Sequence, residues 1–461
     1  MEIIQSWDNG LVNVWDGELR AHRGALIPAH LSHPLRPEDF ARLASQNPRV
    51  MNLIGRKTKA GEPGLMKTLA QPVIDKLSRK IYGKTDLQFR LRRTTGIHVL
   101  LPYYPEDLMR VRFALMNLQP RFERGEHLSK DEQEELRFAN EVSSDLLDLV
   151  LDLYARGVRV ISFGGYLSIA MLNCKWIFRK LRELGIYDLI VTPGSYGTAE
   201  SIRQMVHMLT RKCGIVPRQS RLVIIGCSGA IMRIVNQEIV PMFRETILVG
   251  RDPVRSERTR TGIIGLYEKL TSRVTTMPTE RINEAIALGD LIVSAVNEAD
   301  AVKLNIQAGS FKDGTAILDA SLPSAMTPEV AALKRILAVQ TGNFHLPVNC
   351  QTDPSSARII GFEHPQQAHP CFSEACMWAL LGRWGHIMHT LKQLDEQMLV
   401  KDVYDMKMFR CVKLQFRKFG FKLDSLRSAA GELVQEEDFA RIRQLRQESS
   451  QSFVPRLAEG Y

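Results

Sequence analysis

The stretch VIIGCSGAIMRIV, residues 223–235, decides the fold expected for the middle of this 461-residue chain. An apolar run that reaches a glycine and continues in a helical pattern is typical of the first strand, turn and helix of a dinucleotide-binding unit. Gly226 and Gly229 keep the G-x-x-G spacing that lets a backbone approach a pyrophosphate at a helix start. Met232 stands where a third glycine normally permits close packing, so we expect a wider spacing or a shifted helix there.

Apolar segments recur on the carboxyl side of this turn and alternate with helical or loop segments. After the strand that ends at Gly226 come TILVGR (246–251), SRVTTM (272–277), DLIVSAV (290–296), TAILDAS (315–321) and ILAVQTG (336–342). Such alternation predicts a parallel sheet covered by helices on both faces. We therefore predict an α/β protein with a doubly wound, Rossmann-type nucleotide domain over residues 216–348.

The end of the second strand indicates which nucleotide this domain binds. NAD-binding domains usually place an acid there to hold the ribose 2′-hydroxyl, but this chain has Arg251, with Asp252 one residue late. A guanidinium suits a 2′-phosphate, so we predict NADPH as the cofactor. Arg255, Arg258 and Arg260 follow, and they either extend the phosphate site or form a solvated loop. The predicted cofactor-binding residues are Gly226, Ser228, Gly229, Arg251, Ala295 and Val296.

The rest of the chain divides into three further regions. Residues 1–50 are rich in Pro, His and Arg and are expected to form an irregular N-terminal extension; residues 51–215 are expected to form an α/β substrate domain. Helical patterns dominate from 65 to 150, including a capping box of Ser129 and Glu132. Residues 349–461 are expected to form a linker and a C-terminal helical region. No histidine group has recognisable ligand spacing, so we expect no metal; the groups considered are His22, His30 and His33, and His386 with His389.

Composition bounds the location and the partner. The N-terminus has no signal-peptide pattern, and no apolar run approaches the roughly 20 residues that span a bilayer. Seven cysteines without a CxxC pair fit free thiols in a reducing cytoplasm. The net charge of +10 suits a nucleic acid, an anionic membrane or an acidic protein partner.

A cysteine at a helix start is the first candidate for catalysis. In AHPCFSEACMWALL, residues 368–381, Pro370 suits the first helical turn, so Cys371 is placed among the free N–H groups of that turn. We expect that environment to lower the thiol pKa and favour a nucleophilic thiolate. The alternative is a small buried hydrophobic residue.

Several segments together resemble the cyanobacterial-type long-chain acyl-[acyl-carrier-protein] reductases, which form fatty aldehydes. GGYLSI (164–169) is similar to that family's GG-aromatic-T-S-I segment, and TPGSYGTA (192–199) to its T-T-G-N-T-H-T-A turn. VIIGCSGAI and ILVGR resemble its nucleotide turn and second strand, and PCFSEACMWALL its A-C-F-A-E-A-M-L-L segment. The resemblance is clear from about 155 to 395. Departures from the family pattern are Leu167, Ser195 and Met232.

The resemblance implies NADPH-dependent reduction of an acyl thioester to an aldehyde through an acyl-cysteine. Cys371 falls on the family's nucleophile, and Glu374 on its nearby glutamate, for which helix capping is an equal alternative. His345 is a candidate general acid. The residues implied to bind substrate are Gly164, Gly165, Ser168, Gly194 and Thr198.

An acidic acyl carrier protein would fit the positive charge, and acyl-coenzyme A is the other donor considered. Basic stretches at 76–84, 90–96 and 407–422 are candidate docking surfaces. The last is alternatively a peripheral membrane contact or a packed surface helix. A nucleic-acid partner is not expected. Two other functions stay open: a non-catalytic acyl- or carrier-protein-binding module with a degenerate nucleotide site, and a shikimate dehydrogenase-like NADP dehydrogenase of a small molecule.

Overall fold

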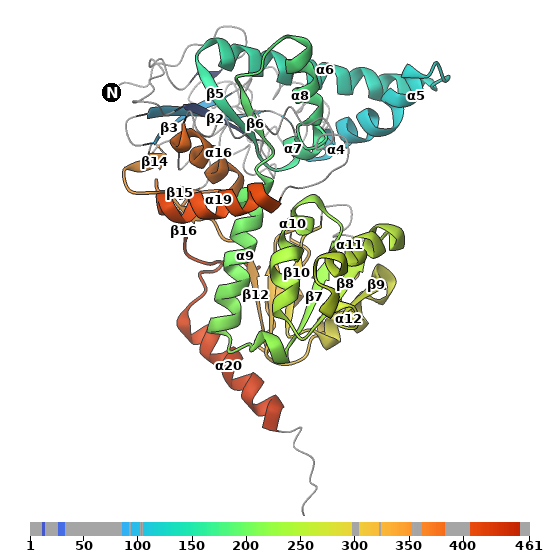
Figure 1. The fold of residues 1–461 in the computed structure, drawn as a ribbon, viewed down its shortest axis with the longest axis vertical. Helices are drawn as coiled ribbons and strands as arrows, with labels where there is room; N and C mark the ends of the chain where they lie inside the picture. Colours follow the sequence, from blue (N-terminus) through green and yellow to red (C-terminus); the bar gives the residue numbers. More distant parts are fainter. Residues whose placement is uncertain are drawn as a thin grey trace, which may run out of the picture. The chain divides into compact units, whose positions relative to one another are not determined.

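The computed structural model describes residues 12–13, 26–32, 85–91, 94–101, 103, 105–296, 304–321, 324–352, 354, 357, 362–382 and 406–451. The chain divides into two compact units (Figure 1). The first consists of residues 1–194, 346–401 and 415–421, and the second of residues 195–345, 402–414 and 422–461.

The second unit is built on a six-stranded, all-parallel sheet in the order β9-β8-β7-β10-β11-β12. This is the doubly wound order in which the first and fourth strands lie side by side at the centre. The predicted strands are confirmed: β7 Arg221–Ile225, β8 Glu245–Gly250, β9 Val274–Pro278, β10 Leu291–Ser294, β11 Thr315–Asp319 and β12 Ile336–Gln340.

Helices cover both faces of this sheet. One face carries α9 Ser195–Lys212, α10 Ala230–Ile239, α11 Pro253–Leu266 and α20 Glu436–Gln451; the other carries α12 Ile282–Leu288 and α14 Pro328–Ala331. Met232 is fully buried in the first of these layers. Its side chain therefore lies between helix and sheet, where a fingerprint glycine would let the two pack more closely. The short elements of this unit are η3 Pro217–Gln219, η4 Val240–Met242, η5 Glu268–Leu270, η6 Thr279–Arg281, η7 Ala308–Ser310, β13 Phe344–His345 and β16 Lys422–Leu423.

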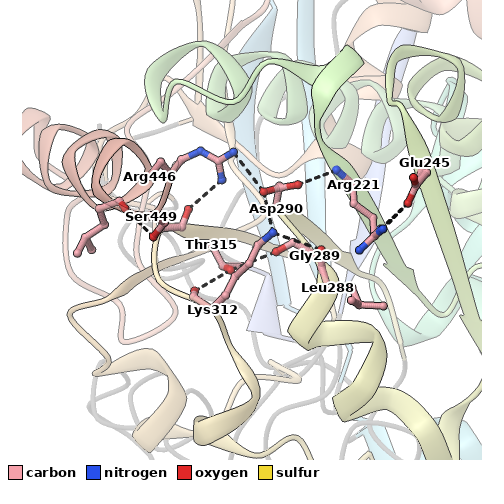
Figure 2. A network of polar contacts seen from close by, with 11 residues as sticks. Arg221, Glu245, Leu288, Gly289, Asp290, Lys312, Thr315, Arg446 and Ser449 are labelled. Atoms are coloured by element: carbon pink, nitrogen blue, oxygen red, sulfur yellow. Dashed lines mark hydrogen bonds and ion pairs between the residues drawn. The ribbon is translucent and has the colours of Figure 1, made fainter. Parts of the chain in front are cut away.

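A carboxylate at the amino ends of the strands ties α20 to the sheet (Figure 2). Asp290 accepts hydrogen bonds from the Arg221 N–H at 2.7 Å and from Arg446 at 3.3 Å, and it pairs with Lys312 at 2.8 Å. Burial raises the pKa of Asp290, but the hydrogen bonds from Lys312 and Arg221, with the charges of Lys312 and Arg446, outweigh it and hold the pKa below its ordinary value. α20 is thus fixed at the amino-terminal ends of the strands, whereas the glycine turn follows the carboxyl end of β7.

The first unit has its own mixed sheet. Its strands follow the order β1-β3-β4-β2-β5-β6, with β14 beside β3, and β4, β2, β5 and β6 are parallel. Their bounds are β1 Val12–Asn13, β2 Ile27–Ser32, β3 Thr85–Leu91, β4 Thr94–Leu100, β5 Val158–Phe163, β6 Ile190–Thr192 and β14 Cys350–Thr352.

One face of this sheet is apolar and packs on a layer of helices. Alternate residues of the central strands, such as Ala29, Leu31 and Val99, are buried against them. The helices are α4 Pro105–Phe113, the π-helix η2 Ala114–Leu118, α5 Gln119–Glu123, α6 Lys130–Ala155, α7 Tyr166–Ala170 and α8 Lys175–Glu183. The capping box of Ser129 and Glu132 is confirmed at the start of α6. The opposite face of the sheet carries α16 Pro370–Leu381.

Four sequence-based expectations about this unit need correction. The irregular extension contains β2, and the helical region contains the hairpin β3–β4. The linker contributes β14 and the short strand β15 Gln367–Ala368. The helix over 195–212 groups with the second unit, not with the substrate region. Pro28 and the histidines at 30 and 98 obscured the strands, because they interrupt otherwise apolar runs.

None of the helices in the described ranges combines the length and hydropathy needed to cross a membrane. Within the same ranges, no cluster of three or more His, Cys, Asp or Glu side chains is arranged to hold a metal ion.

We predict that Asp290→Ala destabilises the second unit by about 2 to 4 kcal/mol, because it leaves the Arg221 N–H without its acceptor and removes the carboxylate that pairs with Lys312 and Arg446. Asp313→Ala is the matched control: its side chain is 50% exposed and pairs with Arg335 at 3.4 Å, and we expect a change below about 0.5 kcal/mol. Urea denaturation of both variants measures the difference, and equal losses would contradict the role given to Asp290.

Candidate active site

Four polar side chains form a row across the parallel strands of the first unit. His98 of β4 lies beside His30 of β2, His30 beside Ser162 of β5, and Ser162 beside Thr192 of β6. All four side chains are buried. Since side chains alternate between the faces of a sheet, the apolar residues next to them supply the opposite face. The row therefore lies under α16, near the carboxyl ends of the strands, where open α/β sheets bind ligands.

The first turn of α16 places a thiol over this row. Pro370 occupies the first helical position, as expected, and Cys371 follows it. The Cys371 Sγ atom lies 3.9 Å from His30 Nε2, and the other ring nitrogen, Nδ1, lies 2.6 Å from Ser162 Oγ. Phe372 packs against the His30 and His98 rings at centroid distances of 5.3 and 5.6 Å.

This arrangement has the geometry of a nucleophile, a base and a residue that orients the base. When the Ser162 hydroxyl accepts a hydrogen bond from Nδ1–H, the neutral His30 ring presents the Nε2 lone pair to the thiol. The distance of 3.9 Å suits a weak sulfur hydrogen bond, and such contacts are often longer before substrate binds. Residues 30, 162 and 371 thus form a Cys–His–Ser arrangement.

The resting thiol and imidazoles are neutral. Burial raises the pKa of Cys371 to about 11, although backbone N–H groups of Phe372, Gly165 and Cys371 itself oppose the shift. Burial, with the neighbouring His98 and His369, holds the pKa of His30 well below its ordinary value. Burial also lowers the pKa of His98 to about 3 and that of His369 to about 4. The expected lowering of the thiol pKa at the helix start is therefore wrong, because burial outweighs the N–H groups.

Two glycines are required for this close approach. Gly194 has φ +69°, and a Cβ atom there would lie 2.2 Å from the Cys371 Cβ. A Cβ on Gly164 would lie 2.8 Å from two atoms of the His30 ring. Gly165 follows with φ +54°, and its carbonyl accepts a hydrogen bond from the Ser168 hydroxyl at 3.0 Å. These four residues were predicted to bind substrate; the structure gives the glycines among them a role in positioning His30 and Cys371.

Glu374 fixes the loop that contains Gly194. Its Oε1 atom accepts hydrogen bonds from the Thr192 hydroxyl at 2.5 Å and from the Trp378 indole at 3.3 Å. The Thr192 hydroxyl in turn accepts from the Gly194 N–H at 3.1 Å. The side chain thus bonds to the end of β6 rather than capping its own helix, and its charge contributes to the raised pKa of Cys371.

The glycine turn of the second unit lies between its two central strands. Gly226 has φ +79°, and a Cβ there would lie 2.4 Å from the Ala295 carbonyl oxygen and 2.9 Å from Val296 Cγ1. Its N–H donates to the Val249 carbonyl at 3.0 Å. The turn therefore brings Gly226, Ala295 and Val296 together at the crevice where such folds bind nucleotides.

The helix after this turn begins without a side-chain cap. Gly229 precedes α10 and is exposed, and no side-chain hydrogen bond caps the helix start. Arg233 donates to the Ser228 carbonyl at 3.1 Å, and Asn236 donates to the Cys227 carbonyl at 3.0 Å. A helix start whose N–H groups have no side-chain cap has the chemistry to hold a pyrophosphate.

The end of β8 carries the residues from which the phosphate site was predicted. Arg251 is exposed directly after the strand. The Asp252 side chain accepts from the Arg255 N–H at 3.1 Å and caps α11. Asp252, the acid next to Arg251, thus caps the start of α11. Arg258 is exposed, whereas Arg260 pairs with Glu257 at 2.7 Å.

The remaining residues predicted from the sequence belong to neither of the two groups of residues described above. Thr198 lies in the first turn of α9, in the second unit, and His345 is exposed in β13. In α19, Met406–Phe419, Val412 and Phe416 are buried, so the basic stretch 407–422 packs as a helix with one apolar face. The stretch 76–84 and the histidines at 22, 33, 386 and 389 lie outside the described residues.

Comparisons with known proteins found no matching family model and no matching curated protein. Solved structures that resemble the chain include quinate dehydrogenase from Corynebacterium glutamicum in complex with NAD (10% identity, 84% of this chain, 99% of that chain, TM-score 0.30). L-tryptophan dehydrogenase from Nostoc punctiforme is 9% identical over 94% of this chain and 91% of that chain, with TM-score 0.26. A dipicolinate synthase from Bacillus halodurans is 11% identical over 39% of this chain, with TM-score 0.23, and this chain spans 58% of it. At these scores the function must be argued from the two sites themselves.

His30 was not among the catalytic residues predicted from the sequence. It lies 341 residues before Cys371, so nothing local connects the two. A usable signal was present: two short apolar runs, 26–31 and 97–101, each contain a single histidine. In parallel neighbouring strands, such residues can fall side by side on one face.

We predict that alkylation of Cys371 by iodoacetamide keeps rising about tenfold per pH unit from roughly pH 8.5 to 10.5, because the reactive thiolate forms only near its pKa of about 11. Peptide mass spectrometry of the labelled, folded protein measures this rate at each pH. A plateau reached near neutral pH would contradict the neutral thiol and restore the thiolate expected from the helix start.

Proposed function

We propose that this protein is a pyridine-nucleotide-dependent oxidoreductase that reduces an acyl thioester to an aldehyde through an acyl-cysteine on Cys371. The observation that carries the proposal is the Cys371 thiol 3.9 Å from the His30 imidazole, in a chain that also has the glycine turn of a nucleotide-binding unit. The motif resemblance to long-chain acyl-[acyl-carrier-protein] reductases supports the same reaction.

Acylation of the thiol is the step for which the first unit supplies every group. His30 Nε2 takes the Cys371 proton as the sulfur attacks the thioester carbonyl. The thiol and the imidazole are both neutral before this step, so no resting thiolate is needed. The bond between carbonyl carbon and the leaving sulfur then breaks, and His30 returns the proton to that leaving thiolate. Ser162 holds the ring in place while it carries the additional proton.

Backbone N–H groups stabilise the charge that develops in this step. Those of Gly165, Phe372 and Cys371 already favour negative charge on the Cys371 sulfur. An attacking sulfur places the carbonyl oxygen within the same small region, where fixed dipoles are effective because they need no reorganisation during the step. Gly194 and Gly164 preserve that geometry, since any side chain at either position would displace Cys371 or His30.

A bound nicotinamide nucleotide supplies the hydride for reduction of the acyl group. Gly226, Gly229 and the start of α10 would hold its pyrophosphate, with Ala295 and Val296 at the adjacent strand end. Arg251 would pair with a 2′-phosphate, which favours NADPH, because Asp252 is engaged at the start of α11.

The donor we propose is an acyl group on a phosphopantetheine thiol, carried by an acidic acyl carrier protein or by coenzyme A. The net charge of +10 favours an acidic carrier. A dehydrogenase of a free small molecule would have no use for a thiol beside a buried base.

We predict that Cys371→Ser loses aldehyde formation by several orders of magnitude while keeping the wild-type melting temperature and nucleotide binding, because an alcohol is a much weaker nucleophile here. Wild-type protein given acyl donor without NADPH should accumulate an acyl mass on the Cys371 peptide, and NADPH should discharge it. Cys376→Ala, a buried cysteine on the same helix, is the control and should keep its turnover. Acylation of Cys376, or normal turnover of Cys371→Ser, would refute the proposal.

We predict that Arg251→Ala raises the Michaelis constant for NADPH at least about tenfold and that for NADH little, because only the 2′-phosphate offers the guanidinium a charged partner. Steady-state kinetics with both nucleotides measure the two constants. Arg218→Ala, an arginine outside the nucleotide turn, serves as the control. An equal effect of Arg251→Ala on both nucleotides would count against the phosphate assignment.

A further inference from the structure

The groups that act on the acyl carbon before reduction all belong to one unit. His30 lies in β2, Ser162 in β5 and Cys371 in α16, and Gly165 follows β5. All of these segments belong to the first unit, whereas the glycine turn at Gly226 belongs to the second. Acyl transfer to Cys371 therefore requires no contribution from a nucleotide.

We propose that this site is also a nucleotide-independent acyltransferase, which exchanges an acyl group between two thiols of the phosphopantetheine class. The inference rests on the acyl-cysteine of the proposed function but not on its reductive half. It assigns the chain a second activity, acyl exchange between carriers, whenever reduced nucleotide is lacking.

The exchange balances without an oxidant or reductant. The donor thioester and Cys371 give acyl-Cys371 and the free donor thiol, with the proton passing from Cys371 through His30 to the leaving sulfur. An acceptor thiol then attacks acyl-Cys371, His30 removes its proton, the bond from the acyl carbon to Cys371 Sγ breaks, and that sulfur takes the proton back. One thioester bond is broken and one is formed in each half, so the overall equilibrium constant is near one.

The surroundings of the dyad favour a thiol over water as the acceptor. His30 is 1% exposed, and its ring is enclosed by His98, Phe372 and Ser162. The Cys371 residue itself is partly exposed, so the acyl group can be reached from outside while the base is shielded. An acceptor thiol must enter where the donor thiol left, which restricts acceptors to the same chemical class as the donor.

The neutral state of the dyad makes the exchange reversible under one set of conditions. A resting thiolate would be a good leaving group and a poor holder of the acyl chain. A thiol with a raised pKa forms a stable thioester, and His30 Nε2, 3.9 Å from the sulfur, can return the proton that lets the sulfur leave when an acceptor thiol attacks. The same site can therefore be loaded from a thioester and unloaded onto a thiol.

The test uses the full chain, stripped of nucleotide, with octanoyl-coenzyme A as donor and free pantetheine as acceptor. We expect octanoyl-pantetheine, followed by mass spectrometry, to form at least about 100-fold faster than without protein, with octanoate as a minor product. Cys371→Ala should abolish the exchange, and Cys376→Ala should retain it. His30→Gln should slow it by about 100-fold or more and make it rise with pH, since the thiol must then ionise unaided.

Three results would overturn the inference or the function beneath it. Acyl-Cys371 that forms but is not discharged by pantetheine refutes the exchange and leaves the acyl-cysteine of the proposed function intact. Octanoate as the main product identifies a hydrolase instead. No acyl mass on Cys371 refutes both the exchange and the proposed reduction.

Discussion

The approach of the α16 backbone to Gly194 is the constraint on which the candidate site depends. The loop after β6 and the first turn of α16 are so close that a single methyl group on Gly194 would overlap Cys371. Glu374 and Thr192 hold the loop in that position through buried hydrogen bonds. Because Glu374 of α16 bonds to Thr192, an outward shift of the loop would move α16 and lengthen the distance from Cys371 Sγ to His30 Nε2. The geometry of the site therefore depends on the absence of a side chain at Gly194 as much as on the side chains present.

The site keeps reactive groups neutral by burying them rather than by pairing charges. Three histidines and a thiol belong to β2, β4 and the start of α16, and burial is the main cause of each of their pKa shifts. Such a site avoids the cost of a buried ion pair until substrate arrives. In the acyl transfer proposed above, charge would develop only during the step itself, and the backbone N–H groups and Ser162 that would stabilise it are already in position.

Much of the second unit could be predicted from the sequence, because its signals are local. Six apolar segments and one glycine turn specify strand, turn and helix without reference to distant residues. Cys371 was likewise identified from its place behind Pro370 and from the motif around it. The thiol pKa was predicted with the wrong sign, because the N–H groups of a helix start are visible in sequence but the protein atoms that bury it are not.

The sheet of the first unit could not be predicted from the sequence, because it pairs strands that lie far apart along the chain. Its central strand β2 comes from a Pro- and His-containing stretch. His30 can be recognised as a candidate base only when β4, β5 and α16 are packed around it. Register decides the outcome: one residue of slip in β2 would turn His30 to the apolar face. No spacing within residues 26–32 reports which strands will be its neighbours.

The order of segments along the chain has a consequence for how the protein forms during synthesis. β2 leaves the ribosome early, but α16 follows only after the whole continuous stretch of the second unit, residues 195–345, has been made. Until that stretch is compact, joining α16 to β2 means closing a loop of roughly 150 flexible residues, which opposes docking entropically. Folding of the second unit draws its two ends together and removes that cost. A nascent or damaged second unit thus leaves the thiol without its histidine, so the candidate site assembles only after the second unit has folded.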